Sequence, residues 1–286
     1  MSVADSMDRT QPEIFQINLK KIIRARPEWY FRHMPGFLIS ILEKIIRQDE
    51  INQILQRIGH LKNFEFIEAA IRELNMEVET EGEENIPNHP NLIFVGNHAL
   101  GGADFLALMH VLKDKFDKVY HLTNDVLMTF EQLRDFFVPV NVFGKNPEKY
   151  RRILEEKLEK GDAPISLFPA GEVARFIDGR LDDGLWRSGF VRFARKYGRS
   201  VVPFYIPTRN SSLFYKVHKI RTKLGIKANL ELFLLPSELL KMRNRKVKII
   251  FGKPLPPSFF QNDMHPHDMS ARVKEIVYAL GEKKKE

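Results

Sequence analysis

Residues 92–104 read LIFVGNHALGGAD, and the fold predicted for the chain is built around these residues. Four apolar residues lead into a polar pair, a loop of small residues follows, and Asp104 opens a second apolar segment. The pattern predicts a buried strand, a tight turn and the beginning of a helix. In open α/β sheets the chemistry usually lies at the carboxyl ends of such strands. We therefore expect His98 and Asp104 to lie together at that edge of a sheet.

His98 and Asp104 carry groups that suit proton transfer. A carboxylate that accepts a hydrogen bond from one imidazole nitrogen fixes the tautomer, and the other nitrogen can then act as a general base toward a hydroxyl or an amine. The pair also has a structural interpretation, in which Asp104 caps its helix and His98 is a hydrogen-bonded residue at a strand end. The spacing alone favours the structural interpretation. The neighbouring motifs are therefore needed to choose between the two interpretations.

Three further blocks accompany this stretch in a fixed order. They read GEENIP at 82–87, FPAGEVAR at 168–175 and VVPFYI at 201–206. Together with the His98 and Asp104 motif, they resemble the motifs of the lysophospholipid (glycerophosphate) acyltransferase superfamily over roughly residues 76–210. The resemblance implies transfer of a fatty acyl group to a hydroxyl, with His98 as catalytic base and Asp104 as the residue that orients it.

Two details depart from the commonest pattern of that superfamily. One additional residue separates His98 from Asp104, and Ala170 stands where the superfamily has a glutamate, with an acid at Glu172 instead. Both details are similar to the branch of haemolysin-like proteins and O-acyltransferases of amino-acid lipids, such as ornithine or glycine lipids. The acceptor is therefore expected to be a lyso-lipid.

The resemblance also implies which residues bind the acceptor. Glu172 and Arg175 follow the turn at Gly171, and the planar fork of Arg175 suits a phosphate or a carboxylate. Lys145 stands near the place where the superfamily carries an arginine. The structural alternatives are an ion pair between Glu172 and Arg175, three residues apart, and a solvated loop lysine at position 145.

Outside the motifs, strand and helix patterns alternate from residue 76 onward. Strands are predicted at 92–97, 118–122, 138–143, 165–168, 201–206 and 247–251. Helices are predicted from Asp104, after residue 122, from a cap at Asn146 to Gly161, at 185–197 and at 268–280. This alternation predicts an α/β fold in which a mostly parallel central sheet is flanked by helices on both faces. We assign residues 76–286 to this acyltransferase domain.

Residues 1–75 form a predicted N-terminal helical region. Apolar residues recur three and four apart over 37–58, with a break near Asp49, and again over 64–74. These amphipathic helices can pack on the catalytic domain, rest on a lipid surface, or do both. In the lipid interpretation, headgroup-level residues are Arg24, Arg26, Trp29, Tyr30 and Arg32. No secretory signal and no apolar run of membrane-spanning length is present.

The charge and composition of the chain restrict the classes of partner that it is expected to bind. The 286 residues contain 45 Lys and Arg against 37 Asp and Glu, and residues 187–253 hold 17 basic residues against two acidic ones. Basic residues at 209, 216, 219, 221, 223 and 227 indicate a surface for anionic lipid or for an acidic acyl-carrier protein. No nucleic-acid-binding motif accompanies them, so nucleic acid is not an expected partner. No metal is expected either, because His265 and His267 fit a loop before a helix better than a ligand set.

The composition also constrains the mechanism. The chain has no cysteine and no Gly-x-Ser-x-Gly motif, so a covalent acyl-enzyme has no evident nucleophile. We expect direct transfer from an acyl-carrier protein or acyl-CoA thioester to the hydroxyl of a lyso-lipid, with no further cofactor. The enzyme is expected to be cytoplasmic and peripheral on the inner face of the membrane. The alternatives are a thioesterase or lipase-like hydrolase, and a non-enzymatic module that binds anionic membranes.

Overall fold

A seven-stranded sheet forms the centre of the computed structural model, which describes residues 16–24, 32–141, 147–177, 179–226 and 229–282. The strand order is β1-β9-β8-β2-β5-β3-β4, and every pairing is parallel except that of β8 with β9. The strands are β1 (Glu77–Glu81), β2 (Leu92–Gly96), β3 (Tyr120–Asn124), β4 (Phe137–Val140), β5 (Ile165–Leu167), β8 (Ser200–Tyr205) and β9 (Lys246–Phe251). The predicted mostly parallel sheet is confirmed.

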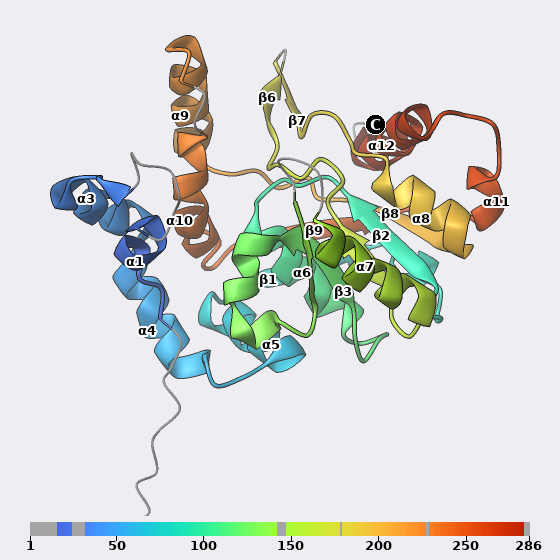
Figure 1. Ribbon diagram of the computed structural model, residues 1–286, viewed down its shortest axis with the longest axis horizontal. Coiled ribbons are helices and arrows are strands. Elements are labelled where there is room, and N and C mark those ends of the chain that lie inside the picture. The colour runs from blue at the N-terminus through green and yellow to red at the C-terminus, as the bar shows by residue number, and fades with distance from the viewer. Residues whose placement is uncertain (1–15, 25–31, 142–146, 178, 227–228, 283–286) are drawn as a thin grey trace, which may run out of the picture.

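Helices cover both faces of this sheet, as predicted (Figure 1). Strand β2 is apolar throughout because its alternate side chains point to two different cores. Leu92 and Phe94 join one core, and Ile93 and Val95 join the other. The first core contains α4 (Gln48–Ile58), α5 (Asn63–Glu73) and α6 (Gly102–Leu112); the second contains α7 (Glu148–Lys160), α8 (Gly189–Tyr197) and α12 (Pro266–Glu282).

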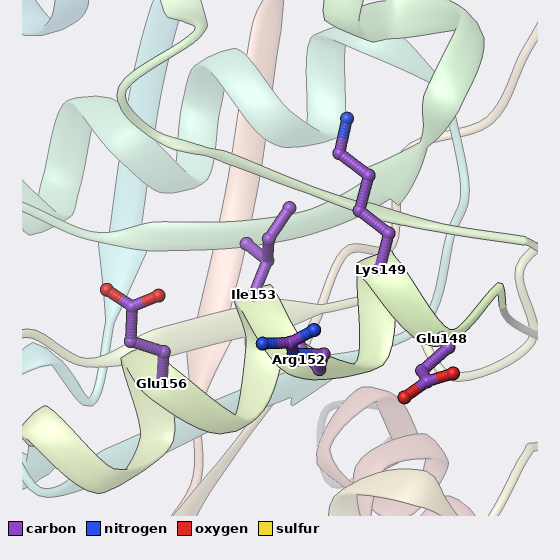
Figure 2. A pocket seen from close by; sticks show the side chains of 5 residues that line it. All are labelled: Glu148, Lys149, Arg152, Ile153 and Glu156. Carbon is purple, nitrogen blue, oxygen red and sulfur yellow. The ribbon is translucent and has the colours of Figure 1, made fainter.

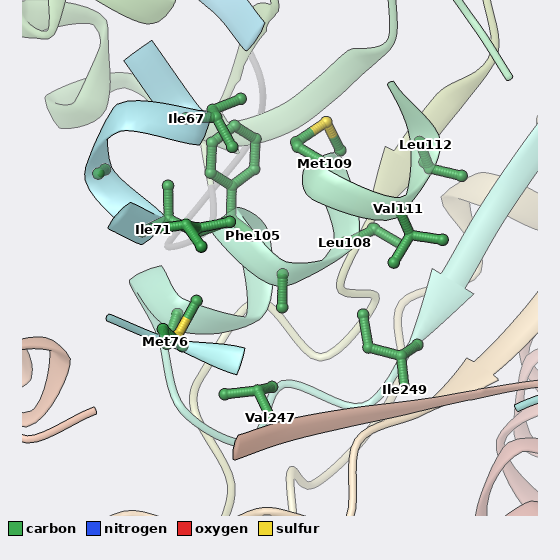
Figure 3. Close-up of a cluster of buried hydrophobic side chains, with 14 of the residues drawn as sticks. Ile67, Ile71, Met76, Phe105, Leu108, Met109, Val111, Leu112, Val247 and Ile249 are labelled. Atoms are coloured by element: carbon green, nitrogen blue, oxygen red, sulfur yellow. The ribbon is translucent and has the colours of Figure 1, made fainter. Parts of the chain in front are cut away.

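Helix α6 is the buried centre of the first core. Figure 3 shows Phe105, Leu108 and Met109 of α6 between the N-terminal helices and the sheet residues Val247 and Ile249. Its side chains are apolar nearly all round, which is typical of a helix enclosed on several sides. This packing fixes the first turn of α6, and with it Asp104, against the carboxyl end of β2.

The N-terminal helices fall into two groups. Helices α4 and α5 share the first core with the sheet, whereas α1 (Leu19–Arg24) and α3 (Gly36–Ile46) form a small separate cluster around Ile23 and Ile39. The break between α3 and α4 lies at Arg47, which has a left-handed backbone conformation, and not at Asp49. Asp49 instead lies in the first turn of α4, where its charge favours the helix dipole.

Several predicted boundaries differ in the structure. Helix α7 has Pro147 at its N-cap position and Gly161 directly after its end, as predicted for Gly161, whereas Asn146 lies outside the described residues. Helix α8 begins at Gly189 and not at 185, because residues 183–188 form a loop that is anchored elsewhere. The short helix expected after residue 122 is a 3₁₀ helix, η2 (Asp125–Thr129).

Other elements had no counterpart in the sequence prediction. Strand β1 alternates charged and β-branched residues and pairs with β9 at the sheet edge. A hairpin and several further helices, one of them within the block at 82–87, also had no predicted counterpart. They are β6 (Arg175–Ile177), β7 (Arg180–Asp182), α9 (Ser212–Lys223), α10 (Leu235–Leu240), α11 (Pro257–Phe260), η1 (Glu83–Asn85), η3 (Glu131–Leu133) and η4 (Leu230–Leu234).

Candidate active site

Asn97 redirects the chain at the end of β2. Its side-chain amide donates to the carbonyl of Ile206 at 2.9 Å, and its amide oxygen accepts the Ile206 N–H at 2.7 Å. The side chain thus continues the pairing of β2 with β8 after the backbone has left the sheet. His98 is consequently the second residue beyond the strand, at the carboxyl edge.

Asp104 holds the loop and the imidazole with a single oxygen. Its Oδ2 lies 2.9 Å from His98 Nδ1 and accepts the N–H groups of Leu100 at 2.8 Å and Gly101 at 3.1 Å. Gly101 has φ +90°, which a residue with a side chain rarely adopts. Asp104 is fully buried in the first turn of α6, where the helix dipole favours a carboxylate. The structural and the catalytic interpretations of Asp104 therefore describe the same arrangement.

The ring of His98 is fixed in orientation and reaches the surface. It stacks on Phe168 at 4.3 Å between centroids with planes 8° apart, and 19% of its side chain is exposed. A carboxylate without a proton only accepts hydrogen bonds, so a neutral imidazole that donates to it from Nδ1 has its lone pair at Nε2. A histidine in that arrangement can accept a proton from a hydroxyl at Nε2.

A second histidine lies behind Phe168. His121 of β3 is buried, its Nδ1 lies 2.9 Å from Ser166 Oγ, and its ring meets Phe168 edge to face at 5.4 Å. Burial, and to a smaller extent the charge of His98, lower the pKa of His121 to about 3. His121 is therefore neutral at physiological pH and presents no competing charge to His98.

The segment that follows Phe168 wraps around His98. Gly171 turns the chain at φ +70°, and the N–H of Ala174 donates to the His98 carbonyl at 2.6 Å. Glu172 and Arg175 form an ion pair at 2.9 Å, which is the structural alternative considered for them, although the segment is not helical. The side chain of Glu172 remains 45% exposed, and that of Arg175 is 9% exposed.

Arg175 is held by a buried charge cluster. Its Nε donates to Glu231 Oε1 at 2.9 Å, and Arg221 and His218 of α9 contact the same carboxylate at 2.8 and 3.1 Å. Burial alone would raise the pKa of Glu231, but hydrogen bonds from its own backbone, Arg221, Arg175 and His218 hold it below its usual range. No sequence motif pointed to Glu231, which lies 56 residues from Arg175.

Asp183 is a second buried carboxylate beside His98. Its Oδ2 accepts the main-chain N–H of His98 at 3.1 Å, and its Oδ1 accepts from Trp186 Nε1 and Tyr278 Oη, each at 2.9 Å. Burial raises the pKa of Asp183, and these hydrogen bonds oppose the rise. No motif pointed to Asp183; an acid in the short polar stretch DDG at 182–184 was the available signal.

The predicted basic surface needs correction at several positions. Arg221 is buried against Glu231 and is not part of a surface, and Phe214 and Tyr215 of α9 are core residues. Lys216, Lys219, Lys223 and Arg209 are exposed. Lys145, Lys227, Arg26, Trp29 and Tyr30 lie outside the described residues.

Exposed apolar side chains gather on two of the outer helices. They are Phe37, Leu38, Ile41 and Ile45 of α3, and Leu213, Ile220 and Leu224 at and after α9. Helix α3 contacts η4 and α10 near the base of α9, and both α3 and α9 stand away from the sheet (Figure 1). Among the helices of the described ranges, none has the length and hydropathy needed to cross a membrane.

One surface depression lies apart from these residues. It is lined by Glu148, Lys149, Arg152, Ile153 and Glu156, all of α7 (Figure 2). The charged side chains point outward along a single helix. None of the lining residues belongs to the His98 site, and nothing in their arrangement indicates chemistry.

Comparison with known proteins identifies the family to which the chain belongs. A family model described as acyltransferase matches residues 21–282. Two lyso-glycine lipid O-acyltransferases, from Bacteroides thetaiotaomicron and Phocaeicola vulgatus, are 36% and 34% identical over 272 residues. Each match covers 95% of this chain, and 100% and 97% of those proteins.

Among solved structures, the 1-acyl-sn-glycerophosphate acyltransferase PlsC from Thermotoga maritima is similar, with 18% identity and a TM-score of 0.45 over 87% of this chain and 93% of that one. The family model alone spans nearly the whole sequence. The chain is an acyl-transfer enzyme and belongs to the acyltransferase family, within the lysophospholipid acyltransferase superfamily that its motifs resemble.

Proposed function

We propose that this enzyme transfers a fatty acyl group from a thioester onto the hydroxyl of a lyso-lipid with an amino-acid headgroup, with His98 as general base. The contact of 2.9 Å between His98 Nδ1 and a fully buried Asp104 carries the proposal. The lyso-lipid acceptor is supported by the two relatives named lyso-glycine lipid O-acyltransferases. Neither relative is named a hydrolase or a binding module, so the alternatives from the sequence have no further support.

The proposed reaction has two proton transfers. Nε2 of His98 takes the proton of the acceptor hydroxyl while its oxygen attacks the thioester carbonyl carbon. Asp104 stabilises the resulting imidazolium. The tetrahedral intermediate then expels the thiolate as the C–S bond breaks, and the imidazolium returns its proton to that sulfur. The products are the acylated lipid and a free thiol, and no enzyme nucleophile is consumed.

The base role can be tested with two histidines of similar surroundings. His110 lies at the other end of α6, and its Nδ1 pairs with Glu68 as that of His98 pairs with Asp104. His98→Ala should abolish product formation from lyso-glycine lipid and acyl-carrier-protein or CoA thioesters, measured by mass spectrometry. His110→Ala should retain it. Retained transfer in folded His98→Ala protein would refute the base role.

The same assay separates transfer from hydrolysis. Transfer requires the acceptor, so release of free thiol should rise with lyso-lipid concentration and match the acylated product. Equal release of fatty acid without lyso-lipid would identify a thioesterase instead. Running the acyl-carrier-protein and CoA thioesters in parallel identifies the donor.

Glu172 is the proposed acceptor contact in the segment after Phe168. Its exposed carboxylate supports this role, whereas Arg175 is covered and engaged with Glu231, so Arg175 holds Glu172 in place. Glu172→Gln should raise the KM for the lyso-lipid. Glu131→Gln, which breaks a comparable exposed pair with Arg134, should leave KM unchanged. Equal KM values in both variants would contradict the assignment.

The enzyme is further proposed to rest on an anionic membrane at the inner face. Support comes from the exposed apolar residues of α3 and α9 and from the exposed lysines of α9, whose charge complements anionic headgroups. Ile220→Asp should weaken binding to vesicles of anionic lipid, and Lys219→Glu should weaken it most at low salt. Leu185→Asp is the control, because Leu185 is 94% exposed and belongs to the loop between β7 and α8, not to α3 or α9. Equal vesicle binding by all three variants would exclude this surface.

A further inference from the structure

Asp183 connects the main chain of His98 to the C-terminal helix. It follows β7, and its carboxylate is buried between His98 on one side and Trp186 and Tyr278 on the other. The two oxygens have separate tasks. Oδ2 accepts the His98 N–H, and Oδ1 accepts the Trp186 N–H and the Tyr278 hydroxyl.

Helix α12 holds the loop that carries Asp183. Ser270, Lys274 and Tyr278 are spaced by four residues and therefore lie along one face of α12. Ser270 Oγ contacts the carbonyls of Trp186 and Arg187 at 3.3 Å, and Lys274 Nζ contacts Asp182 Oδ1 at 2.6 Å. Tyr278 adds the contact with Asp183 itself. One face of one helix thus fixes the loop from end to end.

We propose that Asp183 is a positioning residue of the acyl-transfer reaction, which sets the location of His98 through its main-chain N–H. The inference rests on the proposed function, in which His98 is the base. Asp183 and Ala174 bind the N–H and the carbonyl of His98, while Asp104 and Phe168 orient its ring. Asp104 sets the orientation of the His98 ring, and Asp183 sets the position of the main chain that carries it.

The donors around Asp183 determine what a neutral substitute can do. The Tyr278 oxygen accepts the Asp183 N–H at 3.1 Å, so its hydroxyl proton is directed at Oδ1. All three partners of the carboxylate are therefore donors. An asparagine has one acceptor oxygen, and the two donors at the Oδ1 position attract it away from His98. In Asp183→Asn the amide group then faces the His98 N–H, and that bond is lost.

The test combines Asp183→Asn with Trp186→Phe. The single variant Asp183→Asn should lower kcat by about tenfold or more with little change in acceptor KM, because displacement of a reacting group costs rate and not binding. In the double variant the indole N–H is absent, so the asparagine oxygen can turn to His98 and its amide can donate to Tyr278. We expect kcat of the double variant to be about threefold or more above that of Asp183→Asn, because His98 returns to its position. The thermal midpoint should fall further.

A purely structural role predicts the opposite result. Loss of the buried Trp186 side chain would then add to the damage, and kcat would fall again or stay low in the double variant. Trp186→Phe and Tyr278→Phe alone should lower kcat less than Asp183→Asn does, because Asp183 still accepts from His98. Unchanged kcat in folded Asp183→Asn protein overturns the inference. If His98→Ala also retains activity, the proposed function fails; if only Asp183→Asn does, the positioning role fails alone.

Discussion

Replacement of Asp104 by asparagine separates charge from geometry in this site. Asp104 Oδ2 accepts all three hydrogen bonds, and Oδ1 is buried with no partner among the described residues. The asparagine oxygen can take the place of Oδ2 and keep the bonds to Leu100, Gly101 and His98. The tautomer and the loop are then preserved, and what is lost is the negative charge beside the imidazole.

The size of the effect follows from the distance between the two groups. For charge centres about 4 Å apart at an effective dielectric constant near 20, the attraction lost by the imidazolium is about 4 kcal/mol. This corresponds to about a 10³-fold loss of kcat, with acceptor KM nearly unchanged because the charge forms only in the transition state. The amide nitrogen at the Oδ1 position has no acceptor, so stability should fall by about 1–3 kcal/mol as well.

The assay is steady-state acyl transfer on protein whose folded fraction is known from urea titration. Glu68→Gln is the matched control, because it neutralises the carboxylate partner of His110 at the far end of the same helix. We expect that control to keep kcat. A loss below about tenfold in folded Asp104→Asn protein would refute the reasoning, since it would leave less than about 1.4 kcal/mol for the charge.

Three further predictions concern stability. Since the pKa of His121 is about 3 in the fold against an ordinary 6.5, the unfolded chain binds a proton that the native state does not, so stability falls as pH drops from 6.5 toward 3 by up to about 1.4 kcal/mol per pH unit. Urea midpoints of His121→Gln, which can still contact Ser166, should show a flatter profile there, and an unchanged slope would contradict this. Arg199 is fully buried and contacts four main-chain carbonyls, so Arg199→Ala should cost about 3 kcal/mol in urea unfolding with kcat kept, and a cost near zero would disprove the role. A Cβ at Gly96 would lie 2.3 Å from the Phe204 ring, so Gly96→Ala should lower stability by about 1–3 kcal/mol; a thermal midpoint equal to that of the wild type would show that the ring can move.

The sheet and the contact between His98 and Asp104 were predictable because their sequence signals are local. Residues 92–104 contain the strand, the turn and the helix start in one run, and the two functional residues are only six apart. Alternation of apolar strands with helices then restricts the topology to a mostly parallel sheet. Strand β1 escaped prediction because its EVETE sequence is polar at alternate positions and lies at the sheet edge.

The supporting residues were not predictable because their contacts join distant parts of the chain. Asp183 is 85 residues from His98, and Glu231 is 56 residues from Arg175. An acidic residue in a loop usually points to solvent, so the sequence offers no reason to place either carboxylate in the interior. Burial also explains why Arg221 was misassigned. The sequence predicts a surface charge, whereas in the fold Arg221 forms a buried ion pair with Glu231.

The position of His98 and Asp104 at a strand–helix junction has a physical reason. A buried carboxylate is costly unless donors surround it, and the first turn of a helix supplies unpaired N–H groups and a favourable dipole. Asp104 accepts the N–H groups of Leu100 and Gly101 and has no exposed surface. The same oxygen contacts His98, so the bonds that cap α6 also hold the carboxylate beside the imidazole. In the proposed reaction, a substitution that weakens the cap should therefore weaken catalysis with it.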